Sequence, residues 1–383
     1  MHIASAELFE LTLPLAEPFI ISGGAVTERR SLIVVLRDAE GHAGYGESPP
    51  FELPFYSEET LASARDLIGR VLLPRVRGRE FPTIEDLDDA LRAGIRGNPF
   101  ARAGVETAAW DLEADRSRVG LADLLAAAVG TETARAIPCG VALGIPHDRS
   151  VETLRAQAAD AAASGYRRVK IKVMPGWDIE PVKAVTAVLA GTGIPLTVDA
   201  NGAYEWPRDE PLLRALDELD LLFIEQPLAP DELLGHATLA RALGTPICLD
   251  ETLRDARAAR QVLELDGPRI WNVKVHRVGG LTEVCRIWRL ARGAGVRLWA
   301  GTMPESGIGS QAALAAGSLP GFDLPSDLEP SVRWFGRNVD VIKLTIRPDG
   351  MMAVPRQSVG RLLDPHRFRA SAVRLLSLDA NRV

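Results

Sequence analysis

The central part of the chain alternates short apolar runs with helical stretches. From Ile137 to about residue 317, each run rich in Val, Ile and Leu is followed by a segment with helical spacing of its apolar residues. The runs are IPCGVALG, RVKIKV, IPLTVDA, LLFIEQP, ICLDE, IWNVKV and VRLWAG, and helices are expected at 151–164, 178–190, 209–217, 231–243, 254–264, 280–293 and 306–317. Strands that are apolar on both faces are typical of a parallel sheet covered by helices. The pattern predicts an α/β protein with a (β/α)-barrel rather than an open sheet.

The two ends of the chain have a different pattern. Residues 1–50 contain the β-rich runs IASAELFELTLPL and SLIVVLRDAEGHAGYGE with a glycine-containing loop between them, and residues 57–130 have a helical pattern that begins near Ser57. Near the C-terminus, RNVDVIKLTIRPDGMMAVP predicts a hairpin that returns to the N-terminal unit. We therefore expect an N-terminal α+β capping domain over 1–130, a catalytic barrel over 131–327, and a C-terminal segment over 328–383 that returns to the cap.

Composition and charge narrow the range of partners. The chain has 383 residues, of which 46% are hydrophobic and 25% charged, as in soluble globular proteins. The net charge of −7 and the lack of a basic run with interleaved aromatics argue against a nucleic-acid partner. No apolar stretch reaches the roughly 20 residues of a membrane span, and the N-terminus does not resemble a signal peptide. Three scattered cysteines are expected to be buried thiols, which suits a reducing cytoplasm.

Three carboxylates lie at nearly even intervals, each at the end of an apolar run. They are Asp199 in LTVDA, Glu225 in LLFIEQP and Asp250 in ICLDE. Because the carboxyl ends of barrel strands meet at one mouth, we expect the three side chains to converge. An all-oxygen set suits Mg²⁺, with Mn²⁺ as a substitute, and the absence of Cys and His from the set argues against zinc. Alternatively, these carboxylates cap the following helices or pair with barrel lysines.

Two lysines bracket the carboxylates along the chain. Lys172 precedes Asp199 and Lys274 follows Asp250, while Lys170 shares the face of Lys172 because side chains alternate along a strand. A lysine acts as a general base only when its pKa falls from about 10.4 toward roughly 7–8. A neighbouring ammonium and a divalent cation both favour that fall by like-charge repulsion. Alternatively, these lysines only neutralise the carboxylates.

Further candidates lie beside these residues. Asn201 and Glu251 are expected to orient the ligands by hydrogen bonds, and Glu251 could instead cap a helix. His276 is expected on the rim of the site or against the substrate.

The N-terminal unit is expected to shape the pocket. The loops around Ile21–Val26 and Phe51–Tyr56 would close over the barrel mouth and exclude water. Phe51, Phe55 and Tyr56 would form an apolar wall against the substrate, with an ordinary domain interface as the alternative.

These motifs together resemble the enolase superfamily, in particular its muconate-lactonizing subgroup. Within that subgroup the chain is similar to the o-succinylbenzoate synthase / N-succinylamino acid racemase family. The motifs are PFYSEE (54–59), KIK (170–172), DAN (199–201), IEQP (224–227), CLDE (248–251), NVKVHRVGG (272–280), GTMPESGIG (301–309) and LPSDLEPSVRWF (324–335). The resemblance covers essentially the whole chain and implies a modified TIM barrel of the enolase C-terminal type beneath an N-terminal cap.

The resemblance also implies a mechanism. Lys172 and Lys274 would face the substrate carbon from opposite sides, and Mg²⁺ would stabilise the enediolate that forms when the α-proton leaves. Arg277, Glu305 and Ser306 would join the cap aromatics as substrate contacts. In a synthase Lys172 removes the proton and Lys274 mainly stabilises charge. In a racemase one lysine removes the proton and the other returns it, so the constellation serves both reactions.

Several stretches depart from the family pattern. Pro304 stands where an aliphatic residue is more usual, Val275-His276 replaces Pro-Gly, and the ending PRQSVGRLLD matches loosely. The seventh strand lacks a His, which argues against mandelate-racemase-type chemistry. Asp323-Leu-Pro stands where dipeptide epimerases have Asp-x-Asp, which makes that activity less favoured.

The sequence therefore predicts an enzyme acting on a small-molecule carboxylate. The first expectation is o-succinylbenzoate formation by dehydration, in menaquinone biosynthesis. Racemisation of N-succinylamino acids or other N-acylamino acids is the second, and activities like those of muconate cycloisomerase, dipeptide epimerase or acid-sugar dehydratase are further alternatives. A metal-stabilised scaffold is the non-enzymatic alternative. We expect a cytoplasmic homo-oligomer without nucleic-acid or membrane partners.

Overall fold

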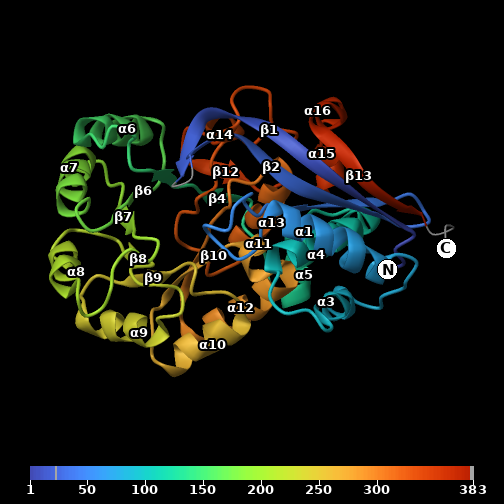
Figure 1. Ribbon diagram of the computed structural model, residues 1–383, viewed down its shortest axis with the longest axis horizontal. Helices are drawn as coiled ribbons and strands as arrows, with labels where there is room; N and C mark the ends of the chain where they lie inside the picture. Colours follow the sequence, from blue (N-terminus) through green and yellow to red (C-terminus); the bar gives the residue numbers. More distant parts are fainter. Residues whose placement is uncertain (22–23, 380–383) are drawn as a thin grey trace.

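A four-stranded antiparallel sheet brings the two ends of the chain together. The computed structural model describes residues 1–21 and 24–379. The strands of this cap sheet, in the order β13-β1-β2-β3, are β1 (Ser5–Ile21), β2 (Gly24–Arg37), β3 (Ala43–Ser48) and β13 (Ala372–Asp379). Figure 1 shows β13 (red) beside β1 (blue).

The segment predicted as a loop between the first two strands is mostly strand. β1 and β2 pair as one long hairpin, with Phe19 opposite Val26 and Ile21 opposite Gly24. Aromatic and β-branched residues in this stretch favour strand geometry, which the glycine pair had obscured. Residues 22 and 23 of the loop expected around Ile21–Val26 lie outside the described residues.

Both faces of β2 are covered, which explains its continuous apolar run. Leu32 and Val34 pack with the cap helices, whereas Ile33 and Val35 belong to the core shared with the barrel. All four side chains are buried. A strand with both faces buried shows no polar alternation.

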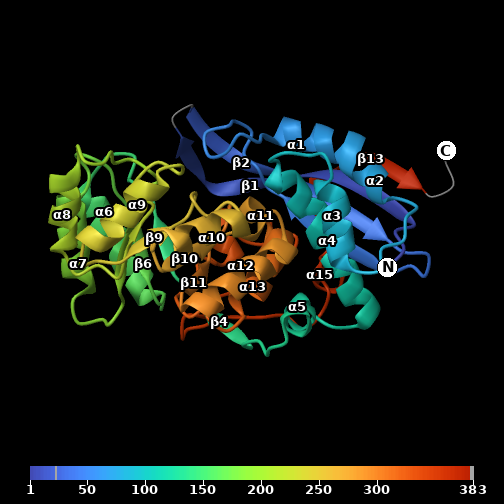
Figure 2. The same ribbon diagram turned by 90° about the horizontal axis from the view of Figure 1, so that it is seen from below.

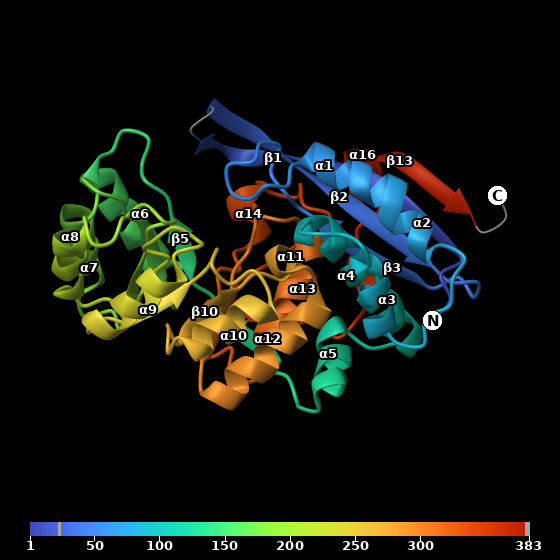
Figure 3. The same cartoon turned by 60° about the horizontal axis from the view of Figure 1, so that its bottom comes forward.

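The cap also contains helices, the first of which lie along this sheet (Figure 3). They are α1 (Leu61–Leu67), a π-helical turn (Ile68–Leu72), α2 (Leu73–Val76), α3 (Ile84–Arg92), α4 (Pro99–Ser117) and α5 (Leu121–Val129). The first helix begins after Thr60, which forms a capping box with Ser63, rather than at Ser57. A Cβ atom at Gly44 of β3 would lie 2.1 Å from the Ala108 carbonyl oxygen, so the close packing of α4 on β3 requires glycine there.

Seven parallel strands form the second sheet, in sequential order, as predicted. They are β5 (Val141–Leu143), β6 (Val169–Lys172), β7 (Leu196–Asp199), β8 (Ile224–Glu225), β9 (Ile247–Leu249), β10 (Ile270–Val273) and β11 (Arg297–Ala300). The helices are α6 (Val151–Ala163), α7 (Ile179–Leu189), α8 (Glu210–Asp217), α9 (Leu233–Ala242), α10 (Ala256–Glu264), α11 (Val275–Val278), α12 (Leu281–Ala294) and α13 (Gly307–Gly317). Figures 1 and 2 show α6 to α9 outside the strands, at the end of the molecule away from β13.

An irregular segment closes the gap between β11 and β5. Phe322 forms a parallel bridge to Leu298 of β11, and Ser326 forms one to Cys139 just before β5. The Asp327 amide then donates to the Ala300 carbonyl at 3.0 Å. This segment occupies the position of an eighth strand and carries Asp327 toward the ends of β11 and β5.

The C-terminal segment reaches the cap through β13 and not through the predicted hairpin. The predicted hairpin forms, with Ile346 bridged to Met352, but β12 (Met351–Ala353) pairs with β4 (Ala136–Pro138) instead of the cap sheet. The short helices α14 (Ser331–Trp334), α15 (Val359–Leu362) and α16 (Pro365–Ser371) flank it, and only β13 joins the cap sheet among the described residues. The domain boundaries at residues 130 and 327 stay a prediction.

Two further expectations concern the cysteines and the membrane. Cys139, Cys248 and Cys285 are buried free thiols, as predicted. Among the described residues, none of the helices combines the length and the apolar character needed to cross a bilayer.

Candidate active site

The five predicted chemical residues lie at the carboxyl ends of consecutive strands. Lys172, Asp199 and Glu225 are the last residues of β6, β7 and β8, and Asp250 and Lys274 directly follow β9 and β10. Parallel pairing places Lys172 beside Asp199, and Asp199 beside Glu225. Strand register therefore brings them to one mouth of the barrel.

Asp199, Glu225 and Asp250 form a tight cluster. Each offers a carboxylate oxygen within 4.8 Å of the other two, and none of the three is more than 1% exposed. Three buried carboxylates repel one another, so the cluster requires compensating positive charge. Its all-oxygen donor set fits a hard divalent cation, and these residues could hold one.

The two bracketing lysines flank the cluster from opposite sides. Lys172 Nζ, on β6, lies 2.6 Å from Asp199 Oδ2, and Lys274 Nζ, after β10, lies 2.8 Å from Asp250 Oδ2. The three carboxylate strands lie between β6 and β10 in the sheet. A small molecule above the cluster would therefore have one ammonium group on each side.

Burial and charge both act on the pKa values in the cluster. Burial alone would raise the pKa of Asp199, but Lys172 and Lys170 hold it well below its usual range. Burial alone would lower the pKa of Lys274, but Tyr56 and Glu251 raise it above its ordinary value. The two shifts favour an ionised Asp199 and a protonated Lys274.

Asn201 and Glu251 connect the cluster to its surroundings. The Asn201 side chain accepts a hydrogen bond from Lys172 Nζ at 2.6 Å and donates one to Glu251 Oε1 at 2.8 Å. Burial, followed by the charge of Asp199, raises the pKa of Glu251. Both contacts suit an orienting function, which stays a prediction.

Two charged residues near the site, Arg168 and Asp327, were not predicted from the sequence. Lys170 Nζ lies 2.9 Å from Glu225 Oε2 and 2.5 Å from Asp327 Oδ2, and Asp327 also pairs with the fully buried Arg168. The signal was present, because Arg168 and Lys170 lie on the same face of the strand leading to Lys172 and two buried cations require an anion.

Asp323 is not the residue to compare with the Asp-x-Asp motif of dipeptide epimerases. Asp323 is more than half exposed and pairs with Arg297 at the start of β11, far from the carboxyl end of that strand. The acidic residues near the mouth are Asp327 and Glu329, so the choice of Asp323 was wrong. The irregular backbone of this segment hid the register from the sequence.

The cap contributes an aromatic group to the site. The Tyr56 hydroxyl accepts a hydrogen bond from Lys274 Nζ at 3.1 Å and lies 3.5 Å from Asp250 Oδ1. The rings of Phe51 and Phe55 are tilted by 38° with centroids 4.6 Å apart, and Phe51 meets Tyr56 edge-on. Arg277 pairs with Asp250 and is 3.5 Å from the Tyr56 hydroxyl, so these candidates converge.

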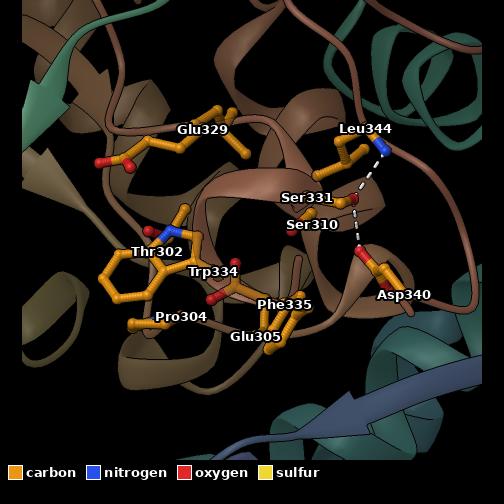
Figure 4. A pocket seen from close by; sticks show the side chains of 11 residues that line it. Thr302, Pro304, Glu305, Ser310, Glu329, Ser331, Trp334, Phe335, Asp340 and Leu344 are labelled. Atoms are coloured by element: carbon orange, nitrogen blue, oxygen red, sulfur yellow. Dashed lines mark hydrogen bonds between the residues drawn. The ribbon is translucent and has the colours of Figure 1, made fainter. Parts of the chain in front are cut away.

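Glu305 and Ser306 lie slightly apart from these groups. Glu305 lines a small hollow with Thr302, Glu329 and Trp334 (Figure 4), and burial raises its pKa to about 7. The Ser306 hydroxyl donates to Glu47 Oε2 at 2.5 Å and caps α13, so it fastens the barrel to the cap. Their substrate contacts stay a prediction.

His276 does not occupy the expected rim position. The residue lies in α11 and is only 2% exposed. Burial, aided by the charge of Arg29, lowers the pKa of His276 to about 3. The side chain is therefore a neutral, enclosed group.

Comparisons with known proteins agree with this architecture. Residues 3–126 match the family model described as "Mandelate racemase / muconate lactonizing enzyme, N-terminal domain", and residues 153–360 match "Enolase C-terminal domain-like". An N-succinylamino acid racemase of Thermus thermophilus is 44% identical over 93% of both chains, and an o-succinylbenzoate synthase of Bacillus subtilis is 37% identical over 93% of both.

A solved structure supports the same assignment. A member of the enolase superfamily from Listeria innocua superimposes with a TM-score of 0.91, at 33% identity and with all of both chains covered. The chain therefore belongs to the enolase superfamily and, within it, to the family of o-succinylbenzoate synthases and N-succinylamino acid racemases.

Proposed function

We propose that this protein is a Mg²⁺-dependent enzyme that removes a proton α to the carboxylate of a small molecule. Its first proposed reaction is the dehydration that forms o-succinylbenzoate in menaquinone biosynthesis, and its second is racemisation of N-succinylamino acids. One observation carries the proposal: Lys172 and Lys274 flank a buried three-carboxylate cluster from opposite sides.

Asp199, Glu225 and Asp250 would hold the cation, with Mn²⁺ as a substitute for Mg²⁺. Their oxygen-only donor set and their close approach fit such an ion. When bound, it supplies positive charge that stabilises the enediolate formed as the α-proton leaves.

The protein's own groups would handle the proton. In the dehydration, Lys172 Nζ would take the α-proton, and Lys274 Nζ would stay protonated and stabilise negative charge. The hydroxide would then leave on the side of Lys172 and take the proton from its Nζ, so that water is lost and Lys172 is neutral again. Burial alone would lower the pKa of Lys274, but Tyr56, Glu251 and Glu225 raise it above its ordinary value. A lysine base at neutral pH requires a lower pKa, and a cation bound by Glu225 and the other two carboxylates would favour that fall by like-charge repulsion.

Racemisation is the second candidate because the site has an ammonium on each side. One lysine would remove the α-proton and the other would return a proton to the opposite face. The 44% identity to a relative named N-succinylamino acid racemase favours this candidate.

The surroundings fit a partly hydrophobic substrate. Phe51 and Tyr56 from the cap and Arg277 from the barrel are the proposed contacts, and Phe55 is 45% exposed beside them. A dipeptide with a free ammonium is disfavoured because Lys170 and Arg168 already occupy the carboxylate of Asp327.

We also infer a cytoplasmic homo-oligomer. Three buried free thiols are consistent with a reducing compartment. Exposed apolar side chains such as Leu53, Leu234 and Val332 supply candidate contact area between copies. Sedimentation velocity measures this state, and a single monomeric species would contradict the inference.

Proton exchange in D₂O with Mg²⁺, followed by NMR, tests the function. The cyclohexadiene precursor of o-succinylbenzoate and N-succinyl-phenylalanine would be supplied in parallel. Rapid aromatisation of the precursor with slow α-deuteration of the amino acid supports the synthase, and the reverse supports the racemase. Inactivity on both, in a folded protein that binds Mg²⁺, would refute the proposed substrates and leave the scaffold alternative.

A further inference from the structure

We propose that Arg29 is a positioning residue that holds the cap segment 49–56 over the barrel mouth and thereby sets affinity for the substrate. The proposal rests on the function proposed above, because it concerns how the same site retains its substrate. Arg29 lies on β2 and does not contact the carboxylate cluster in the described part of the chain.

The Arg29 guanidinium joins two separate loops. Nη1 donates to the Pro50 carbonyl oxygen at 3.0 Å, and Nη2 donates to that of Pro49, both in the cap segment. Nη2 also donates to the Met303 carbonyl at 3.2 Å, and Nε donates to that of Pro304 at 3.2 Å. The acceptors at 303 and 304 belong to the loop that follows β11, so one side chain ties the cap segment to the barrel.

Burying the Arg29 guanidinium costs more free energy than filling the same space with an apolar side chain would. Arg29 is only 6% exposed, and within the described residues its hydrogen bonds all end on backbone carbonyls rather than on a carboxylate. Burial lowers the pKa of Arg29 to about 10, although the charges of Glu47 and Glu305 act in the opposite direction, so those carboxylates offset only part of the desolvation penalty. An apolar side chain could fill the same space at lower cost, but it could not hold two loops by directed hydrogen bonds.

A chain of contacts connects Arg29 to the site. Its guanidinium lies over the Phe51 ring, 4.6 Å from the centroid. Phe51 meets Tyr56 edge-on at 6.3 Å, and the Tyr56 hydroxyl is 3.1 Å from Lys274 Nζ. Residues 51–60 contain neither helix nor strand, so regular backbone pairing does not fix this segment. In the described part of the chain, Arg29 connects the start of this segment to the loop after β11, and Tyr56 connects it to the barrel mouth. Glu52 of the segment also pairs with Arg30, but that residue belongs to β2 of the cap.

Another joint between cap and barrel already exists. The buried carboxylate of Glu47 accepts hydrogen bonds from Ser306 and from the Gly309 amide at 2.9 Å. Loss of Arg29 should therefore release the segment 49–56 without separating cap and barrel. This distinction separates a positioning function from a merely structural one.

The test compares Arg29→Met with the matched variant Arg75→Met. Arg75 is also an arginine of the cap that donates to backbone carbonyls, those of Ala90 and Ala93, but it lies outside the site. Hydrogen exchange of peptides covering 49–60 and steady-state kinetics with both proposed substrates would be measured in Mg²⁺. Arg29→Met should speed exchange in this segment and raise KM about tenfold, equivalent to about 1.4 kcal/mol, while kcat changes less. Arg29→Lys should have a KM between those of the wild type and Arg29→Met. Arg75→Met should change neither the exchange rate of the segment nor KM.

Each outcome decides the proposal. Unchanged exchange and unchanged KM in a folded Arg29→Met variant would overturn it. If that variant does not fold, Arg29→Lys and Phe51→Leu, alone and combined, replace it. Additive effects of these two on KM would refute action through Phe51, and non-additive effects would support it. If the wild type turns over neither substrate, the proposed function fails, and unchanged exchange in the segment would still refute the positioning function.

Discussion

Lys170 Nζ lies 2.5 Å from Asp327 Oδ2, and this ion pair joins the second strand of the barrel to the irregular segment that closes it. Asp327 also pairs with Arg168, so one carboxylate contacts two buried cations, and Lys170 pairs with Glu225 as well. Burial alone would lower the pKa of Lys170, but Asp327 and Glu225 raise it well above its ordinary value. Lys170 is therefore a fixed positive charge beneath Glu225, not a second base.

Replacing Asp327 should destabilise the protein. The Asp327→Asn variant leaves Arg168 and Lys170 buried with less negative charge, and breaking such a pair costs about 3 kcal/mol or more. Urea unfolding monitored by circular dichroism measures the change. Asp323→Asn is the matched control, because that exposed carboxylate should matter by less than about 0.5 kcal/mol. Equal stability of the two variants would contradict the importance of the network.

Removing one cluster carboxylate should weaken Mg²⁺ binding. Asp250→Asn takes one charged oxygen donor from the set, so we expect Mg²⁺ affinity to fall at least about tenfold, equivalent to about 1.4 kcal/mol. Isothermal titration calorimetry measures the affinity. Asp323→Asn is the control, since this exposed carboxylate pairs with Arg297 and lies outside the cluster. Wild-type affinity in Asp250→Asn would show that the ligand assignment is wrong.

Lys172 and Lys274 should each exchange the α-proton of a different enantiomer of the substrate. If they face opposite sides of the substrate, Lys172→Ala should abolish racemisation yet still allow α-proton exchange from one enantiomer of N-succinyl-phenylalanine. Lys274→Ala should show the opposite preference. Exchange in D₂O followed by chiral chromatography measures this. Loss of exchange from both enantiomers in both variants, with an unchanged melting temperature, would argue that the lysines do not act separately.

His236 should make stability depend on pH. Burial lowers its pKa from 6.5 to about 4, although the hydrogen bond of Nδ1 to the Glu232 carbonyl acts in the opposite direction. In the neutral ring, Nε2 accepts a hydrogen bond from the Leu228 amide. Between these values the unfolded chain binds more protons than the folded one, so stability falls as pH decreases from about 6.5 toward 4. The loss from this residue should reach about 2 kcal/mol at pH 5.

The His236→Gln variant tests this dependence. It should flatten the slope of unfolding free energy between pH 7 and 5, although its hydrogen bonds are lost at every pH. Urea unfolding over this pH range measures the slope. His147→Gln, which changes an exposed histidine, should leave it as in the wild type. An unchanged slope in His236→Gln would assign the acid sensitivity to other groups.

The sequence alone determined the parallel barrel and the gathering of its five chemical residues. Period and length of the apolar runs identify strands that are buried on both faces. In a parallel barrel the strand ends meet at one mouth, so Lys172, Asp199, Glu225, Asp250 and Lys274 converge wherever regular strands carry them. The local hydrophobic pattern is sufficient to predict these strands because the barrel repeats one strand–helix unit.

Only the tertiary structure decided the contacts between irregular segments. Asp327 lies on the irregular segment that closes the barrel, which has no alternation of apolar and polar residues. Arg29 of the cap donates a hydrogen bond to the Met303 carbonyl of the barrel. Likewise, β13 pairs with β1 although they lie at opposite ends of the chain. No repeating hydrophobic pattern in the intervening sequence predicts that these residues come into contact. Their contacts depend on how the folded cap packs against the folded barrel.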